Sequence, residues 1–255
     1  MTPIGYERRT AGASEGLAVI AAAAWLERIL GSGLTLHAWA SERPDVEALR
    51  GRGTVYSIDA PLAGPDARVR WAVRHYRRGG AITSYLDDRY LSGGRTRPER
   101  EIRVSVEARA RGVPTPAVIT GAWYRSGVFY RADLVTELVP GALSLADSLF
   151  SDERSANTVS RLARSGRLVR DLGEKGVLHA DLNAMNILLS SERPEPVAYV
   201  IDLDRASVRD APEAALGDSM QRRLERSLRE LGDSTGRPLS KDDWAALRAG
   251  FEGEA

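Results

Sequence analysis

The chain carries His-Ala-Asp-Leu-Asn-Ala-Met-Asn-Ile-Leu-Leu at residues 179–189, the most informative stretch of the sequence. Asp181 and Asn186 place a carboxylate and an amide on one polar loop, directly before an apolar run. A second apolar run, Tyr199-Val200-Ile201, ends at Asp202. Phosphoryl transfer needs a carboxylate aimed at a hydroxyl, and an amide oxygen and a second carboxylate suit Mg²⁺. The spacing therefore indicates a phosphotransferase.

Upstream of this loop, the sequence predicts a small sheet that carries one helix. β-Branched and aromatic residues alternate with other residues in Thr54–Ile58 and Val69–Tyr76, which favours strands. The stretch Pro98–Arg111 favours a helix, because proline is common in a first turn. Two further strands are expected at Val118–Trp123 and Val128–Val139.

After Pro140 the pattern changes to helices. The expected elements are helices at Ser144–Phe150, Ala156–Lys175, Met220–Leu231 and Lys241–Phe251, and a hairpin of Ile187–Leu189 with Tyr199–Ile201. The sequence therefore predicts an extension of residues 1–48 with one helix near Glu15–Leu30, a sheet-bearing lobe of residues 49–139 and a helical lobe of residues 140–255.

Composition excludes several classes of function. The 255 residues hold 36 Lys and Arg against 35 Asp and Glu, and this balance argues against a general nucleic-acid binder. The absence of cysteine removes disulfides and thiolate chemistry and suits a reducing compartment. No apolar stretch reaches the ~18 residues of a membrane span, and Leu17–Leu26 favours a buried or amphipathic helix over a secretory signal.

The loop resembles the catalytic loop of protein kinases, H-R-D-L-x-x-x-N, and residues 202–204 resemble the metal-binding D-F-G that follows it. This chain has H-A-D-L-N-A-M-N and D-L-D at these places. The resemblance implies an α+β, bilobal protein-kinase-like fold. Its N-lobe would be a small antiparallel sheet with one main helix, and its C-lobe would be mainly helical.

The resemblance extends to the phosphate-binding elements of the N-lobe. Gly51 and Gly53 precede the first strand of that lobe, where glycine lets backbone N–H groups approach phosphate oxygens. Arg74 stands where kinases carry the lysine of V-A-I-K, and it keeps the positive charge. Its expected partner is Glu101, and Glu107 is the less favoured alternative.

Several other stretches resemble the 3-deoxy-D-manno-octulosonic acid (Kdo) kinases of the lipopolysaccharide kinase group, over about residues 49–232. These stretches are Arg74–Gly80, Asp88–Leu91, Gly112–Pro116, Tyr130–Thr136, Pro140–Ala142, His179–Asn183 and Ile201–Arg205. Arginine at position 74 looks usual for these enzymes. The resemblance implies transfer of the ATP γ-phosphoryl group to a hydroxyl, by similarity the 4-hydroxyl, of Kdo on a lipid A precursor in lipopolysaccharide core biosynthesis.

The same resemblance implies a role for each site residue. Asp181 would orient the sugar hydroxyl and accept its proton, while Asn186 and Asp202 would hold Mg²⁺ against the ATP phosphates. Arg74, ordered by Glu101, would clamp those phosphates.

Two further roles concern adenine and the loop itself. Backbone groups near Glu137 to Val139 would meet adenine at the seam between the lobes. His179 is interpreted as an organiser of the catalytic loop rather than a base.

The acceptor would carry carboxylates and phosphates, which arginine binds well. Arg77, Arg78 and Arg89 are the candidate acceptor-binding residues, and the alternative is a solvated arginine-rich face. Arg205 is open to the same two interpretations. The helix Met220–Leu231 is interpreted mainly as an ordinary C-lobe helix, with contact to an anionic membrane as the alternative.

The leading hypothesis is a cytoplasmic Kdo kinase, peripheral at the inner face of the membrane, that acts on a lipid-linked sugar without nucleic-acid or protein partners. One alternative is a small-molecule phosphotransferase of the aminoglycoside or choline type. Another is a nucleotide-binding pseudokinase scaffold. A protein kinase is disfavoured because no A-P-E-like sequence follows Asp202.

Overall fold

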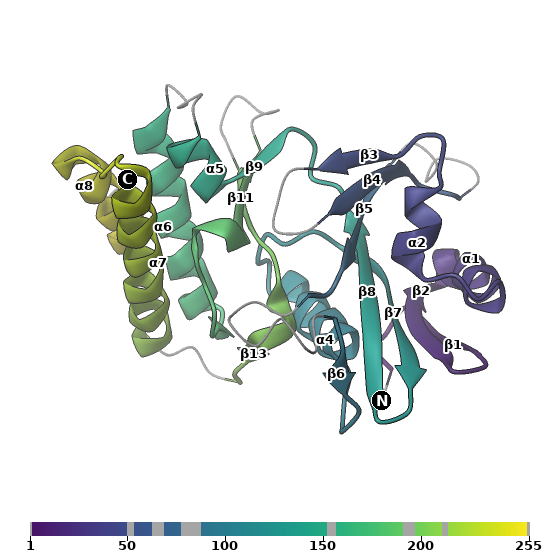
Figure 1. Cartoon of the computed structure of the whole chain (residues 1–255). Coiled ribbons are helices and arrows are strands. Elements are labelled where there is room, and N and C mark those ends of the chain that lie inside the picture. The colour runs from purple at the N-terminus through teal and green to yellow at the C-terminus, as the bar shows by residue number, and fades with distance from the viewer. Residues whose placement is uncertain are drawn as a thin grey trace. The chain divides into compact units, whose positions relative to one another are not determined.

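The computed structural model describes residues 2–49, 54–62, 69–77, 88–151, 157–190, 197–210 and 214–253 (Figure 1). The chain forms two compact units. Unit 1 comprises Met1–Val106 with Ala117–Leu138, and unit 2 comprises Glu107–Pro116 with Val139–Ala255.

Unit 1 is built on an eight-stranded sheet in which neighbouring strands are antiparallel. The strand order is β1-β2-β7-β8-β5-β4-β3, and β6 pairs with β8. The strands are β1 (Tyr6–Ala11), β2 (Ser14–Val19), β3 (Glu47–Leu49), β4 (Val55–Asp59), β5 (Arg70–His75), β6 (Tyr90–Leu91), β7 (Val118–Ser126) and β8 (Phe129–Glu137). The helices are α1 (Ile20–Gly31), α2 (Leu36–Ser41) and α4 (Arg97–Ala110), whose residues up to Val106 belong to this unit.

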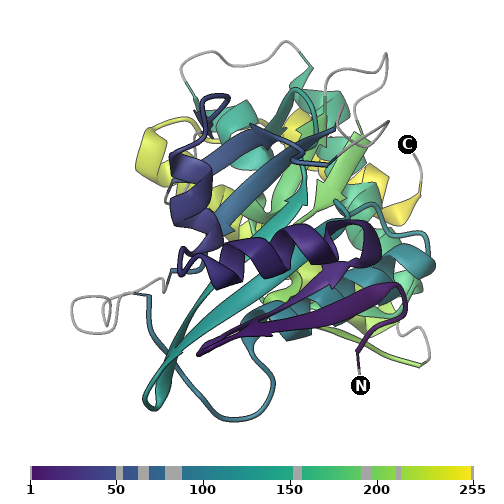
Figure 2. The same cartoon turned by 90° about the vertical axis from the view of Figure 1, so that its right-hand side faces the viewer.

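Helices cover both faces of the sheet, as the side chains along β5 show. Successive side chains of a strand point to opposite faces. Trp71 and Val73 pack in a buried cluster with residues of α1 and α2, whereas Tyr76, just beyond the strand, packs in a second cluster with Ile102 of α4. Figure 2 shows α1 lying across the strands. The strand and helix predictions for residues 54–139 are confirmed to within a few residues at each end.

The N-terminal segment differs from the prediction of one helix near Glu15–Leu30. Its first part is strand β2, and the helix begins only at Ile20, while α2 adds a second helix. The reason is tertiary: a Cβ on Gly16 would lie 2.9 Å from the carbonyl oxygen of Gly121 on β7, so the two strands approach closely. Such pairing outweighs the local helical pattern.

Unit 2 is mainly helical and carries two small sheets. Its helices are α5 (Leu145–Phe150), α6 (Thr158–Glu174), α7 (Ala214–Thr235) and α8 (Lys241–Glu252), with short 3₁₀ turns η2 (Ala184–Asn186) and η3 (Leu203–Arg205). Its strands are β9 (Ala142–Ser144), β10 (Val177–His179), β11 (Ile187–Ser190), β12 (Val197–Val200) and β13 (Ala206–Val208). The predicted helices and the predicted hairpin, β11 with β12, are confirmed.

The helices α6 and α8 pack backbone to backbone. A Cβ on Gly166 of α6 would lie 2.1 Å from the carbonyl oxygen of Leu247, and a Cβ on Gly250 of α8 would lie 2.0 Å from the carbonyl oxygen of Ala163. Both positions at this helix crossing therefore require glycine. The pattern of apolar residues in the sequence does not indicate this close approach.

Candidate functional site

The loop between β10 and η2 presents Asp181 to solvent from a fixed backbone. The carbonyl oxygen of Asp181 accepts hydrogen bonds from the side-chain amides of Asn183, at 2.9 Å, and Asn186, at 3.1 Å. The Asp181 side chain itself is 61% exposed. A carboxylate that is accessible while its backbone is held on both sides suits a group that must meet a substrate hydroxyl.

His179 is fully buried and links this loop to Ile201, the residue after β12. Its Nδ1 accepts the backbone N–H of Asp181 at 3.2 Å, so in the neutral ring Nε2 donates to the carbonyl oxygen of Ile201 at 3.1 Å. Burial lowers the pKa of His179 and outweighs the hydrogen bond to Ile201 and the neighbouring carboxylates. A buried, neutral imidazole with both nitrogens engaged organises the loop, as predicted.

The pairing of β11 with β12 places Asn186 opposite Ile201, the residue before Asp202. The backbone N–H of Ile201 donates to the carbonyl oxygen of Asn186 at 3.0 Å, at the end of the β11–β12 hairpin. Asn186 is buried, with 8% of the residue exposed, and its bond to Asp181 uses an amide N–H. The amide oxygen, the atom type that Mg²⁺ prefers, is not used by that bond.

Asp202 has a left-handed backbone, with φ 64° and ψ 53°. Among the described residues it is the one non-glycine residue with positive φ. Aspartate tolerates this conformation better than most residues, although it costs free energy, and such outliers gather at functional sites. The bend lies between β12 and η3, directly after the strand that ends beside Asn186.

In unit 1, Arg74 of β5 forms an ion pair with Glu101 of α4, as predicted. The Arg74 Nη2 lies 2.5 Å from Glu101 Oε1. The hydroxyl of Tyr76 donates to the same carboxylate, and the Arg74 guanidinium lies 4.7 Å from the centre of the Tyr76 ring. Glu101 is almost fully buried, whereas the alternative Glu107 is half exposed and pairs with Arg111. The nucleotide-binding role of Arg74 and Glu101 stays a prediction.

A family model with the description "Lipopolysaccharide kinase (Kdo/WaaP) family" matches residues 36–251. The chain belongs to this lipopolysaccharide kinase family. It is 32% identical to a 3-deoxy-D-manno-octulosonic acid kinase of Xylella fastidiosa (strain M12), over 86% of this chain and 84% of the relative. It is 35% identical to the kinase of that name from Stenotrophomonas maltophilia (strain K279a), over 84% of this chain and 81% of the relative.

A solved structure, WaaP in complex with acyl carrier protein, has the same fold as this lipopolysaccharide kinase. The TM-score is 0.51 at 17% sequence identity, over 85% of this chain and 81% of that chain. The predicted α+β, bilobal protein-kinase-like fold is therefore confirmed, and the family makes the chain a phosphotransferase. The strands β1 and β2 and the helices α1 and α2 are present in addition to the one main N-lobe helix that was predicted.

The residues of the lipopolysaccharide kinase that would hold Mg²⁺ are oxygen donors of the right kind. Magnesium takes one or two protein ligands and completes its shell with water and phosphate oxygens. No cluster of three or more His, Cys, Asp or Glu side chains that could enclose a metal occurs in the described part of the chain. Asn186 and Asp202 are a pair, which fits an ion shared with a nucleotide and does not suit a closed structural site.

The structure describes only some of the glycines and arginines predicted to bind phosphate or the acceptor. Gly51, Gly53 and Arg78 lie outside the described residues. Arg77 and Arg89 are both exposed in unit 1.

The stretch predicted to meet adenine, residues 137–139, has backbone groups that are hydrogen-bonded within the chain. The backbone N–H of Glu137 donates to the carbonyl oxygen of Ala117, and the carbonyl of Val139 accepts from Ala142. The adenine contact predicted for Glu137 to Val139 stays a prediction.

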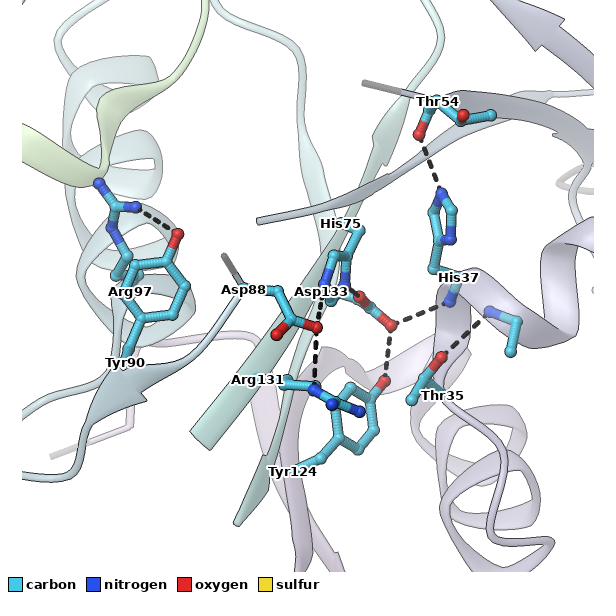
Figure 3. A network of polar contacts seen from close by, with 11 residues as sticks. Thr35, His37, Thr54, His75, Asp88, Tyr90, Arg97, Tyr124, Arg131 and Asp133 are labelled. Atoms are coloured by element: carbon cyan, nitrogen blue, oxygen red, sulfur yellow. Dashed lines mark hydrogen bonds and ion pairs between the residues drawn. The ribbon is translucent and has the colours of Figure 1, made fainter. Parts of the chain in front are cut away.

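A network around Asp133 was not predicted from the sequence (Figure 3). Asp133 is fully buried on β8, and its Oδ2 accepts the backbone N–H of His37 and the hydroxyl of Tyr124, each at 2.9 Å. Its Oδ1 lies 2.6 Å from Nδ1 of His75, which follows Arg74 on β5. The available signal was a carboxylate between the apolar residues Ala132 and Leu134, which does not identify its partners.

The network continues from His75 towards solvent. His75 Nε2 lies 3.2 Å from the carboxylate of Asp88, and Arg131 Nε lies 2.8 Å from the same oxygen (Figure 3). Asp88 directly precedes Arg89. The buried carboxylate of Asp133 thus anchors, through His75, the backbone that carries a predicted acceptor-binding arginine.

The helix α7 is part of the core of unit 2. Met220, Leu224 and Leu228 are fully buried, and the Met220 sulfur accepts the backbone N–H of His179. The interpretation of this region as an ordinary C-lobe helix is therefore correct, and the apolar side needed for membrane contact is already used. Among the described residues, no helix has the length and apolar character that a membrane crossing requires.

Proposed function

We propose that this chain transfers the γ-phosphoryl group of ATP to the 4-hydroxyl of Kdo on a lipid A precursor, in lipopolysaccharide core biosynthesis. Membership of the lipopolysaccharide kinase family and the identity to Kdo kinases support the reaction class. The observation that carries the proposal is the exposed Asp181 carboxylate, whose backbone is held by the amide of Asn186, and Asn186 lies opposite Ile201, the residue before Asp202.

Asp181 orients the acceptor hydroxyl in this proposal and takes its proton as the bond to phosphorus forms. The leaving group is ADP, so the γ-phosphoryl group passes from the β-phosphate oxygen to the sugar oxygen. Asn186 and Asp202 would hold Mg²⁺, which neutralises charge on the phosphates when it is bound. Arg74, fixed by Glu101, supplies a further positive charge for the phosphates.

The acceptor sets where the enzyme works. A sugar attached to a lipid A precursor lies at a membrane surface, so we place the activity at the cytoplasmic face of the inner membrane. Arg77, Arg78 and Arg89 are the proposed contacts for the acidic groups of the acceptor.

The expectation of no protein partner is replaced by a different proposal. The structural neighbour WaaP was solved in complex with acyl carrier protein. We therefore propose that this chain also binds an acyl carrier protein. Co-elution of the purified proteins in size-exclusion chromatography tests this, and separate elution at micromolar concentrations of both would overturn it.

Mass spectrometry of a Kdo-containing lipid A precursor, incubated with the protein, ATP and Mg²⁺, tests the main proposal. We expect the mass of one phosphate to be added, with fragments that place it on Kdo, and no addition by Asp181→Ala. An unmodified acceptor together with intact ATP binding would overturn the proposed substrate. It would favour a small-molecule phosphotransferase or a pseudokinase, which a panel of free sugars then separates.

A further inference from the structure

Backbone pairing between β10 and β13 places Arg205 beside the proposed catalytic carboxylate of Asp181. It ends η3, and the next residue begins β13, which pairs with β10 so that Ala206 faces His179. The antiparallel register therefore brings residue 205 next to the start of the catalytic loop. Its position does not depend on the reach of a flexible side chain.

The side-chain contact between Arg205 and Asp181 is loose and open to solvent. Arg205 Nη1 lies 3.5 Å from Asp181 Oδ2, longer than the 2.7–2.9 Å that is usual for such charged hydrogen bonds. The two side chains are 63% and 61% exposed. An exposed ion pair of this kind adds little to folding stability, so stability does not explain why an arginine stands here.

The guanidinium keeps donors for a second anion. Arginine has five N–H donors in a planar fork, and one contact to Asp181 leaves most of them available to a carboxylate. The proposed acceptor is an acid, as the name of the relatives states. Its carboxylate is part of the same sugar as the hydroxyl that Asp181 would deprotonate.

We propose that Arg205 binds the carboxylate of the acidic sugar acceptor and so determines which hydroxyl reaches Asp181. The inference rests on the proposed function, because it names how that site selects its substrate. Binding of the carboxylate at Arg205, beside Asp181, brings the acceptor's anion and its reacting hydroxyl to neighbouring protein groups at once. A neutral sugar would gain nothing from Arg205.

The test compares two acceptors and three variants. The acceptors are the Kdo-containing lipid A precursor and the same molecule with the Kdo carboxylate converted to an amide. The variants are Arg205→Ala, Arg205→Lys and, as a matched control, Arg209→Ala, which removes another exposed arginine of the same segment. KM and kcat are measured for each acceptor and for ATP.

The wild type and Arg209→Ala should prefer the acid over the amide by about tenfold or more in kcat/KM. Arg205→Ala should lose this preference mainly through a higher KM for the acid, with an unchanged KM for ATP. Arg205→Lys should keep part of it, because the charge remains while the fork is lost. Unchanged melting temperatures would establish that the variants fold.

Two results would overturn the inference. One is Arg205→Ala with the wild-type preference for the acid. The other is an equal loss of kcat on both acceptors, since that is the behaviour of a residue that only orients Asp181. If the wild type phosphorylates neither acceptor while it binds ATP, the proposed function itself is wrong, and the Arg205 inference fails with it.

Discussion

His75 and Asp133 share a short hydrogen bond across neighbouring strands of unit 1, with Nδ1 2.6 Å from Oδ1. The other ring nitrogen faces the carboxylate of Asp88. Ionised carboxylates only accept hydrogen bonds, so a ring between two of them must donate from both nitrogens and carry a positive charge. Burial by itself would lower the pKa of His75, but the bonds and charges of Asp133 and Asp88 outweigh it and raise the pKa.

This relationship predicts how stability depends on pH. The pKa of His75 is higher in the folded chain than its ordinary value of about 6.5, so the stabilisation is complete below pH ~6.5. It is lost as pH rises through the raised pKa. The stability difference between the wild type and His75→Gln should therefore be larger at pH 6 than at high pH, as measured by urea unfolding. An equal difference at every pH would contradict a charged His75.

Asp181→Asn should strongly slow phosphoryl transfer and leave ATP binding intact. Loss of a positioned base lowers the rate by about 10²–10⁴-fold. The side chain is exposed, so the variant should fold like the wild type. Turnover by mass spectrometry and ATP binding by calorimetry measure the two effects. The control Asp210→Asn changes another exposed aspartate of unit 2 and should retain full turnover. Near-normal turnover of Asp181→Asn would contradict the assignment of Asp181 as the base.

Asp202→Asn should weaken ATP binding only when Mg²⁺ is present. Asparagine tolerates the left-handed backbone seen at φ 64°, so the change removes the charge without adding backbone strain. We expect about tenfold or more weaker binding in Mg²⁺ and little change in EDTA. Titration calorimetry in the two buffers gives the comparison. Equal weakening in both buffers would mean that Asp202 does not act through the metal.

Glu101→Gln should raise the KM for ATP by about tenfold, because Arg74 loses the charged partner that orders it. The matched change Glu107→Gln removes only the exposed pair with Arg111 and should leave the KM unchanged. Steady-state kinetics at saturating acceptor separates the two. If Glu107→Gln raised the KM for ATP and Glu101→Gln did not, Glu107 would be the residue that orders Arg74.

Gly166→Ala should destabilise the chain by about 1–3 kcal/mol, because its Cβ would lie 2.1 Å from the carbonyl oxygen of Leu247. Gly31→Ala, at the end of α1, meets nothing within 4 Å and should be neutral or slightly stabilising. Urea unfolding of the two variants provides the measurement. Similar midpoints would mean that α6 and α8 do not cross as closely as described.

Local patterns in the sequence determined the geometry of the candidate catalytic loop. Asp181 and Asn186 lie on one short loop, and their geometry follows from neighbours within a few residues. The β11–β12 hairpin and the amphipathic helices likewise depend on short-range periodicity. The Arg74–Glu101 pair was also predictable, because a family resemblance supplied the partner that spacing leaves open.

Only the tertiary structure decided the N-terminal strands, the Asp133 network and the contact of Arg205 with Asp181. Strand β2 exists because it pairs with β7, and Thr120 donates to the carbonyl of Leu17 across a separation of 103 residues. Pairings of this kind depend on which distant segments meet, and the burial they bring outweighs local propensity. A buried carboxylate such as Asp133 is visible in the sequence, but its partners come from other elements of the fold, brought within hydrogen-bonding distance only when the sheet assembles.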